Sequence, residues 1–123
     1  MENVVSKAGI EWDGAAVRAW LQSRIVAARA DQVAAERYGR ERQDDCDVAA
    51  AEEMVCTLLA GKDAVNSQGD FAAELKALLD RDVYIWRGVY DDRRFDRHVR
   101  TMIRKLAKMT KTNDGFGKVM RYQ

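Results

Sequence analysis

The sequence contains no proline, a single histidine and only two cysteines among its 123 residues. Because proline interrupts helices and the chain is rich in Ala, Leu, Arg and Glu, we expect a mostly α-helical protein. No apolar run approaches the roughly 18 residues that a membrane span needs. The N-terminus also lacks the pattern of a signal peptide. These absences predict a soluble, cytoplasmic protein that makes no membrane contact.

The residues that usually carry catalysis or bind metals are also scarce. His98, Cys46 and Cys56 match no zinc or redox motif. Acidic residues gather between Asp44 and Glu53, but the loop pattern of a calcium site is missing, and the helix dipole explains acids in a first helical turn. We see no paired nucleophile and base and no phosphate loop. We therefore predict no enzymatic activity, cofactor or metal, and two buried, reduced thiols, with an intermolecular disulfide as the alternative.

Charge is present in both signs but is distributed unevenly along the chain. Residues 1–80 hold 9 Lys or Arg against 15 Asp or Glu, a net charge of −6, whereas residues 81–123 hold 12 against 5, a net charge of +7. Such asymmetry indicates that the basic end binds a polyanion, binds an acidic protein, or is neutralised by the acidic half of the same or another chain.

The N-terminal region, residues 1–62, predicts two helices that form a core or a dimerisation element. Asp13 is a good N-cap for a long helix from Gly14 to Tyr38, and a second helix is expected over 46–60, capped by Asp44 or Asp45 and ended by a left-handed Gly61. The apolar residues at three- and four-residue steps are expected to be buried: Val17, Trp20, Leu21, Ile25, Ala28, Val33 and Tyr38 in the first helix, and Val48, Ala51, Val55, Leu58 and Leu59 in the second.

The segment 61–70 contains glycines and small polar residues and is predicted to be a linker. A helix over 71–81 should follow it, capped by Asp70, and then a short helix over 82–90. The two regions, 1–62 and 70–123, are expected to form one compact unit.

A strongly basic helix is expected over 95–109. Its apolar residues recur at three- or four-residue steps and define one buried face: Phe95, Val99, Met102, Ile103, Leu106 and Met109. A cationic stripe with similar steps occupies another side, formed by Arg97, Arg100, Arg104, Lys108 and Lys111 and flanked by Arg93, Arg94 and Lys105. Like charges at these spacings repel by a few tenths of a kcal/mol per pair, and a bound anion would offset that cost.

Beyond this helix the period changes. Asn113, Asp114 and Gly115 favour a turn, and the alternation in GKVMRYQ at 117–123 predicts a β-hairpin. The run FDRHVRTMIRKLAKMTKTNDGFGKVMRYQ resembles the recognition helix and wing of winged helix-turn-helix DNA-binding domains. The resemblance covers residues 70–123 and implies helices over 71–80 and 83–90, a recognition helix over 95–109 and a wing tip at 113–117.

The resemblance implies a small DNA-binding regulator, with double-stranded DNA a better target than RNA, and a homodimer through the N-terminal helices. Arg93, Arg94, Arg97, Arg100 and Arg104 would face the DNA groove, with Lys105 beside them, and Lys108, Lys111, Lys118 and Arg121 would contact phosphates. The alternative hypothesis is a helical protein-interaction module, such as a phage- or plasmid-type inhibitor or adaptor, whose basic helix docks on an acidic protein.

Overall fold

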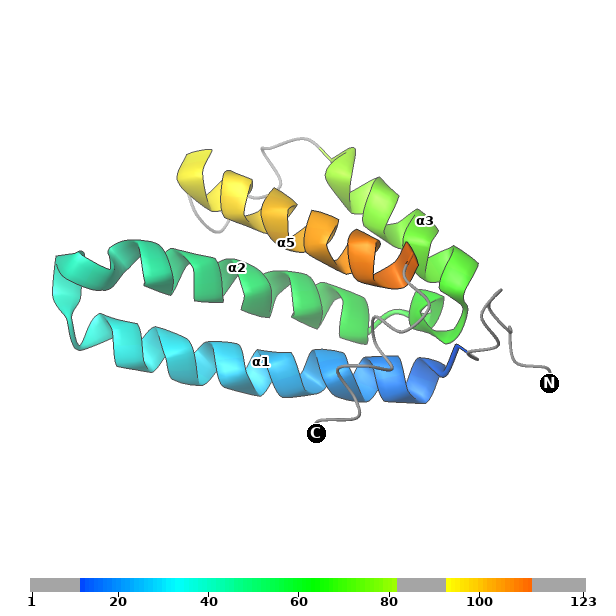
Figure 1. Ribbon diagram of the computed structural model, residues 1–123, viewed down its shortest axis with the longest axis horizontal. Coiled ribbons are helices and arrows are strands. Elements are labelled where there is room, and N and C mark those ends of the chain that lie inside the picture. The colour runs from blue at the N-terminus through cyan, green and yellow to red at the C-terminus, as the bar shows by residue number, and fades with distance from the viewer. Residues whose placement is uncertain (1–11, 82–92, 112–123) are drawn as a thin grey trace.

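The computed structural model describes residues 12–81 and 93–111, which form four α-helices and two short 3-10 helices. In chain order these are α1 (Gly14–Glu36), η1 (Gly39–Arg42), α2 (Gln43–Ala60), η2 (Asp63–Asn66), α3 (Gln68–Leu79) and α5 (Arg93–Lys111). Figure 1 shows α1 and α2 lying side by side, with α5 and α3 on the far side of α2 from α1.

Helices α1 and α2 form an antiparallel hairpin. The Asp13 side chain accepts a hydrogen bond from the Ala16 backbone N–H and so caps the start of α1. After α1 ends, Gly39 adopts a φ of +60°, a left-handed conformation that glycine reaches without steric cost, and the chain reverses into η1. Ion pairs then join the two helices. The Arg24 guanidinium donates two hydrogen bonds to Glu52, one to each carboxylate oxygen.

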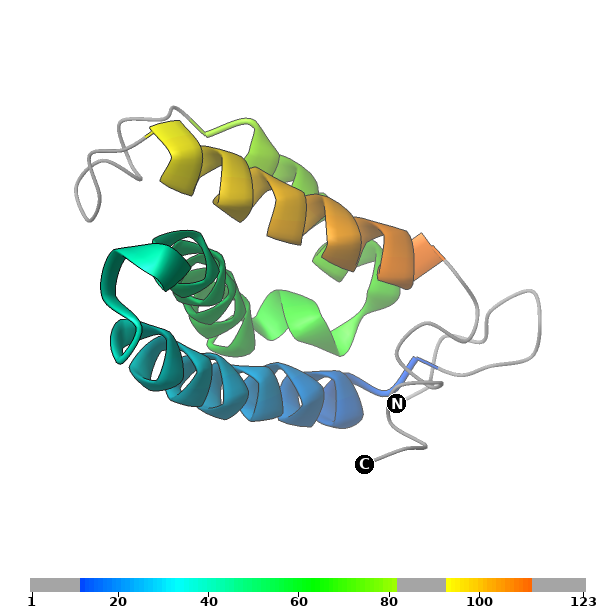
Figure 2. The ribbon, with the colours of Figure 1, turned by 60° about the vertical axis from the view of Figure 1, so that its left-hand side comes forward.

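Helices α3 and α5 complete the core. Helix α5 packs against both α2 and α3, whereas its backbone does not come close to that of α1. Figure 2 shows the same order of layers from a second direction, with α2 between α1 and α5. All four helices contribute to one cluster of buried side chains, whose largest fully buried members are Leu21, Val55, Leu59, Phe71, Leu75, Leu78, Phe95, Val99, Ile103 and Leu106.

The connection between α2 and α3 is packed into this core. Val65 in η2 is fully buried, and its carbonyl accepts a 2.8 Å hydrogen bond from the Trp12 indole Nε1. Gly14 lies so close to Asn66 that an added Cβ would stand 2.7 Å from the Asn66 Cα. The segment predicted as a linker therefore holds the start of α1 against the start of α3.

The predicted fold class is wrong. Residues 12–81 and 93–111 contain helices only, with no β-strand among them, and α5 packs on α2 of the N-terminal hairpin as well as on α3. This helical arrangement replaces the predicted winged-helix-like region, because the apolar face of α5 is buried jointly by the hairpin and α3. The predicted hairpin with its wing tip at 113–117 and the predicted short helix over 82–90 lie outside the described residues.

Several local predictions also need correction. Helix α1 ends at Glu36, and Val33 and Tyr38, both expected to be buried, are 54% and 56% exposed. Val48 of α2 is likewise 47% exposed. Gly61 ends α2 with a φ of −84°, so it is not a left-handed stop.

The two remaining helix starts differ from prediction too. Helix α2 begins at Gln43, before the two aspartates expected to cap it. The cap of α3 is Ser67, whose hydroxyl accepts a hydrogen bond from the Asp70 backbone N–H. Both starts therefore lie upstream of the predicted aspartate caps.

Candidate nucleic-acid interface

Helix α5 separates apolar and cationic residues onto opposite faces. Five of the six residues predicted for its buried face, Phe95, Val99, Met102, Ile103 and Leu106, are buried, Met109 is partly buried, and Thr110 is buried as well. Thr110 satisfies its buried hydroxyl by donating to the Leu106 carbonyl at 2.8 Å. With about 100° of rotation per residue, these positions leave the opposite side of the helix to solvent.

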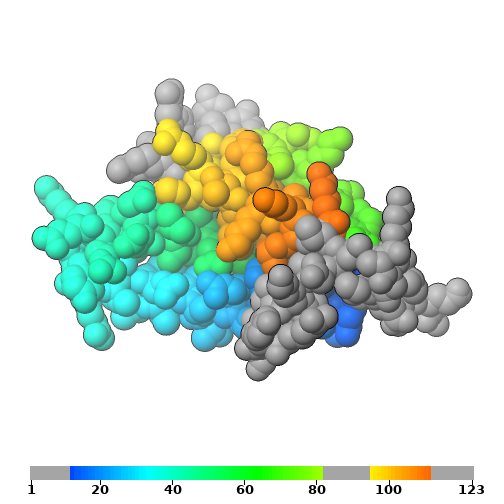
Figure 3. All heavy atoms as spheres, viewed as in Figure 1, coloured from blue at the N-terminus to red at the C-terminus, as the bar shows by residue number. Residues whose placement is uncertain are grey.

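That solvent side carries five exposed cations, which we call the cationic stripe: Arg97, Arg104, Lys105, Lys108 and Lys111. None of their side chains forms an ion pair or hydrogen bond with another residue in the described parts of the chain. Figure 3 shows α5, coloured yellow to orange, reaching the molecular surface along its length. The stripe is therefore a row of uncompensated positive charge facing water.

Arg100 was predicted to belong to the same stripe, but its guanidinium is bound within the protein. It donates to Asp96 Oδ2 at 3.0 Å, to the Leu79 carbonyl at 2.6 Å and to the Arg81 carbonyl at 3.1 Å. The last carbonyls of a helix have no intrahelical partner, so Arg100 caps the C-terminal end of α3. Its side chain is 25% exposed, and three of its five guanidinium N–H groups are bound to acceptors within the protein.

The other predicted site residues are placed as follows. Arg93 and Arg94 begin α5, but their side chains are outside the described part of the structure, as are Lys118 and Arg121. The structure therefore brings together five of the ten predicted residues on one open face and assigns Arg100 to a different task.

His98 lies beside the stripe and connects α5 to the start of α2. Its Nε2 is 3.0 Å from Asp44 Oδ1, and the histidine side chain is 20% exposed while the aspartate is 68% exposed. The contact fixes the N-terminal half of α5 against the hairpin. It also places one carboxylate at the edge of the cationic face.

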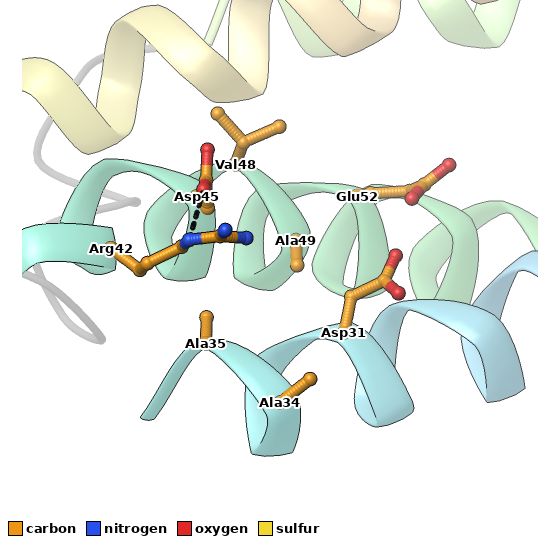
Figure 4. Close-up of a pocket in the computed structure, with 8 residues that line it drawn as sticks. All are labelled: Asp31, Ala34, Ala35, Arg42, Asp45, Val48, Ala49 and Glu52. Atoms are coloured by element: carbon orange, nitrogen blue, oxygen red, sulfur yellow. Dashed lines mark ion pairs between the residues drawn. The ribbon is translucent and has the colours of Figure 1, made fainter. Parts of the chain in front are cut away.

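Two concave features lie near the hairpin. A groove of about 230 Å³ runs between α5 and the hairpin, where Thr101 and Lys105 of α5 face Arg24 and Glu52. A second groove of about 360 Å³ lies between the C-terminal half of α1 and the start of α2 (Figure 4). Its charged lining is largely paired, since Arg42 contacts Asp45 at 3.8 Å and Glu52 binds Arg24.

The titratable groups of the hairpin fit a structural role. Burial, assisted by the nearby Glu52 carboxylate, raises the pKa of the Cys56 thiol to about 12. Hydrogen bonds from Arg29 and Gln32 lower the pKa of the Glu53 carboxyl. Cys56 is fully buried as predicted, whereas Cys46 is only partly buried.

Metal sites and membrane-spanning helices were also sought among the described residues. Among residues 12–81 and 93–111, no three His, Cys, Asp or Glu side chains are grouped so as to hold a metal ion. Within the same residues, no helix combines the length and apolar character needed to cross a membrane.

Comparisons with known proteins do not extend this picture. No family model, no curated protein and no solved structure matches the chain.

Sequence reasoning missed the residues that hold the site in place. The i, i+4 spacing of Asp96 and Arg100 gave a local indication that this arginine has a partner. The sequence contained no indication that Arg100 binds the two carbonyls at the end of α3. These carbonyls are about 20 residues away in the sequence, and every residue has a backbone carbonyl, so the residue type does not mark them. Gln68, which donates to the Thr110 carbonyl near the end of α5 at 2.8 Å, was missed for the same reason.

Proposed function

We propose that the protein binds nucleic acid through the cationic stripe of α5. The observation that carries the proposal is the contrast between the row of cations on α5 and the two arginines of α1 that face α2. Arg24 and Arg29 of α1 are paired with Glu52 and Glu53 across the hairpin, whereas the five cations of the stripe have no acidic partner in the described residues.

Five adjacent, unpaired cations favour a ligand with regularly repeated negative charge. They repel one another, and every phosphate that enters the row relieves that repulsion while releasing counterions. The stripe is also backed by the fully buried residues Val99, Ile103 and Leu106, so the helix that presents it is held rigidly. A rigid row of Arg and Lys is the arrangement that binds a phosphate backbone without prior ordering.

The alternative is that the same stripe docks on an acidic protein. Salt would weaken the binding of either ligand, so salt dependence alone does not distinguish nucleic acid from an acidic protein. The range of ligands that bind does separate the two hypotheses, because a nucleic-acid-binding protein should bind unrelated nucleic-acid sequences at low salt. An interaction module should bind one protein and no nucleic acid.

The test is a fluorescence anisotropy titration of labelled random-sequence DNA at two salt concentrations. The variant is Arg104→Ala with Lys108→Ala, and the matched control is Arg40→Ala with Lys76→Ala, which removes the same charge from exposed positions outside α5. We expect the stripe variant to bind at least tenfold more weakly than the control while both remain folded. No binding by the parent at low salt, or equal binding by the two variants, would contradict the proposal.

Homodimerisation through the N-terminal helices stays a prediction. The outer side of α1 exposes Val26 to 67% and Val33 to 54%, together with several alanines. Since α1 and α5 lie on opposite sides of α2 (Figure 1), two copies joined through α1 would direct their stripes away from each other. Such a dimer would not place two recognition helices on adjacent half-sites. Light scattering distinguishes a 14.0 kDa monomer from a dimer of twice that mass.

A further inference from the structure

The cations of the stripe are divided into two groups along the helix axis. At about 1.5 Å per residue, Arg97 precedes Arg104 by about 10.5 Å, and only Thr101 is exposed on this face between them. The remaining cations, Arg104 to Lys111, then follow within a further 10.5 Å or so. The stripe is thus a single arginine, a neutral gap and a cluster of four charges.

This division matches the spacing of two phosphate backbones across a groove. The major groove of B-form DNA is about 12 Å wide, close to the separation of Arg97 from the cluster. A helix lying across the groove would place Arg97 at one strand and the cluster at the other, with Thr101 above the groove.

Within residues 12–81 and 93–111, no exposed aromatic side chain lies beside the stripe to stack on unpaired bases. Proteins that bind single strands use aromatic side chains as stacking platforms. In the described residues, Trp20, Phe71 and Phe95 are buried and Trp12 packs against the core. The exposed Tyr38 is covered by the Arg42 guanidinium and precedes η1, an element that does not contact α5.

The described side chains near the stripe also offer few groups that could hydrogen-bond to base edges. Arginine is the side chain that most often recognises guanine, through two hydrogen bonds. Arg100, which lies in the gap between Arg97 and Arg104, is bound to α3, and Thr101 directs its hydroxyl to the Arg97 carbonyl at 2.9 Å. Among the side chains of α5 that the structure describes, the two remaining arginines, Arg97 and Arg104, are at the positions that match the two backbones.

Resting on the proposed function, we infer that the target of the stripe is the sugar–phosphate backbone of a double helix, held on both sides of one groove without recognition of base sequence. The expected affinity is then set by charge and by duplex geometry. It is the same for unrelated sequences.

The experiment measures binding of the full chain to three unrelated duplexes of equal length and to a single-stranded oligothymidine, each over a series of salt concentrations. If all five cations contact phosphates, the slope of log K against log salt should be about −4.5, since each contact contributes about −0.9. We expect the three duplexes to agree within about threefold and the single strand to bind at least tenfold more weakly.

Variants test the two groups of charge separately. Arg97→Ala and Lys108→Ala should each reduce the magnitude of the slope by about one and the double variant by about two, equally on all duplexes. Thr101→Ala is the control within the gap and should leave both affinity and slope unchanged.

The outcomes separate this inference from the proposed function. A preference of 100-fold or more for one duplex, equal binding of the single strand, or an unchanged slope in Arg97→Ala would overturn the duplex-backbone inference while leaving nucleic-acid binding in place. No binding of any nucleic acid at low salt would overturn the proposed function itself.

Discussion

Replacing Arg100 by alanine should destabilise the protein far more than replacing Arg104, although both are arginines on the same helix one turn apart. Arg100 makes three charge-assisted hydrogen bonds, to Asp96 and to the carbonyls of Leu79 and Arg81. Its removal also leaves Asp96 with both carboxylate oxygens unpaired, because Oδ1 is buried and has no partner even in the parent.

The expected loss of stability in Arg100→Ala follows from these contacts. Hydrogen bonds to charged groups contribute roughly 1.5–3 kcal/mol each, and breaking a fully buried ion pair costs about 3–5 kcal/mol. The pair here is only partly buried, at 25% and 16% exposure, so water replaces part of the loss. We expect Arg100→Ala to lower the free energy of unfolding by about 2–4 kcal/mol. Arg104→Ala should change it by less than about 0.5 kcal/mol.

Urea denaturation followed by far-UV circular dichroism measures both values. A double-mutant cycle with Asp96→Ala should give a coupling energy of at least about 1 kcal/mol, since the two side chains share one interaction. Arg100→Lys should be intermediate, because an ammonium group cannot reproduce the planar fork that reaches three acceptors. If Arg100→Ala is no more destabilising than Arg104→Ala, the assignment of Arg100 as the cap of α3 is wrong.

Three further predictions concern the core and the hairpin. Ile103→Ala removes a fully buried side chain and should cost about 2–5 kcal/mol of unfolding free energy, measured by urea denaturation. Gly14→Ala should lower the melting temperature because its Cβ would approach the Asn66 Cα to 2.7 Å, whereas Gly61→Ala meets nothing closer than 3.9 Å and should be tolerated; equal melting temperatures would contradict the close approach. The third prediction follows from the Cys56 pKa of about 12. Since an unfolded thiol ionises near about pH 8.5, the unfolded state binds fewer protons between these values, and stability should fall as pH rises through that window. Cys56→Ala should show a weaker fall over the same range, and an identical pH profile would show that the thiol is not protected.

Strong local patterns predicted the helices that they belong to. The Asp13 cap and the apolar steps of α1 are both present in the structure, and the buried face of α5 from Phe95 to Leu106 is confirmed residue by residue. These features depend on the chain within a few turns, so the sequence contains what is needed to find them.

Which apolar side chains are buried by other helices could not be predicted in the same way. Val33 continues the apolar pattern of α1, but the described elements whose backbones approach α1 are α2, η1 and η2, and η2 lies at the start of the helix, far from Val33. The fold class predicted for the C-terminal region was wrong for a related reason. The pattern at 95–109 specifies a helix with one apolar face, yet it does not specify that the N-terminal hairpin supplies much of the surface that buries this face.

Some arginines bind carbonyls at helix ends and others face solvent, and the sequence does not distinguish the two kinds. Arg18 of α1 donates to the carbonyls of Ala60 and Lys62 at 2.9 Å each, just as Arg100 donates to the end of α3. Each helix end has carbonyls that need donors, and a long cationic side chain from a neighbouring helix can supply them. In the sequence such an arginine cannot be distinguished from one that faces solvent, since both follow the helical period. Part of the basic excess thus stabilises the fold, and the charge that α5 offers to a ligand in the described residues is the five cations of the stripe, whose side chains no carbonyl or carboxylate binds.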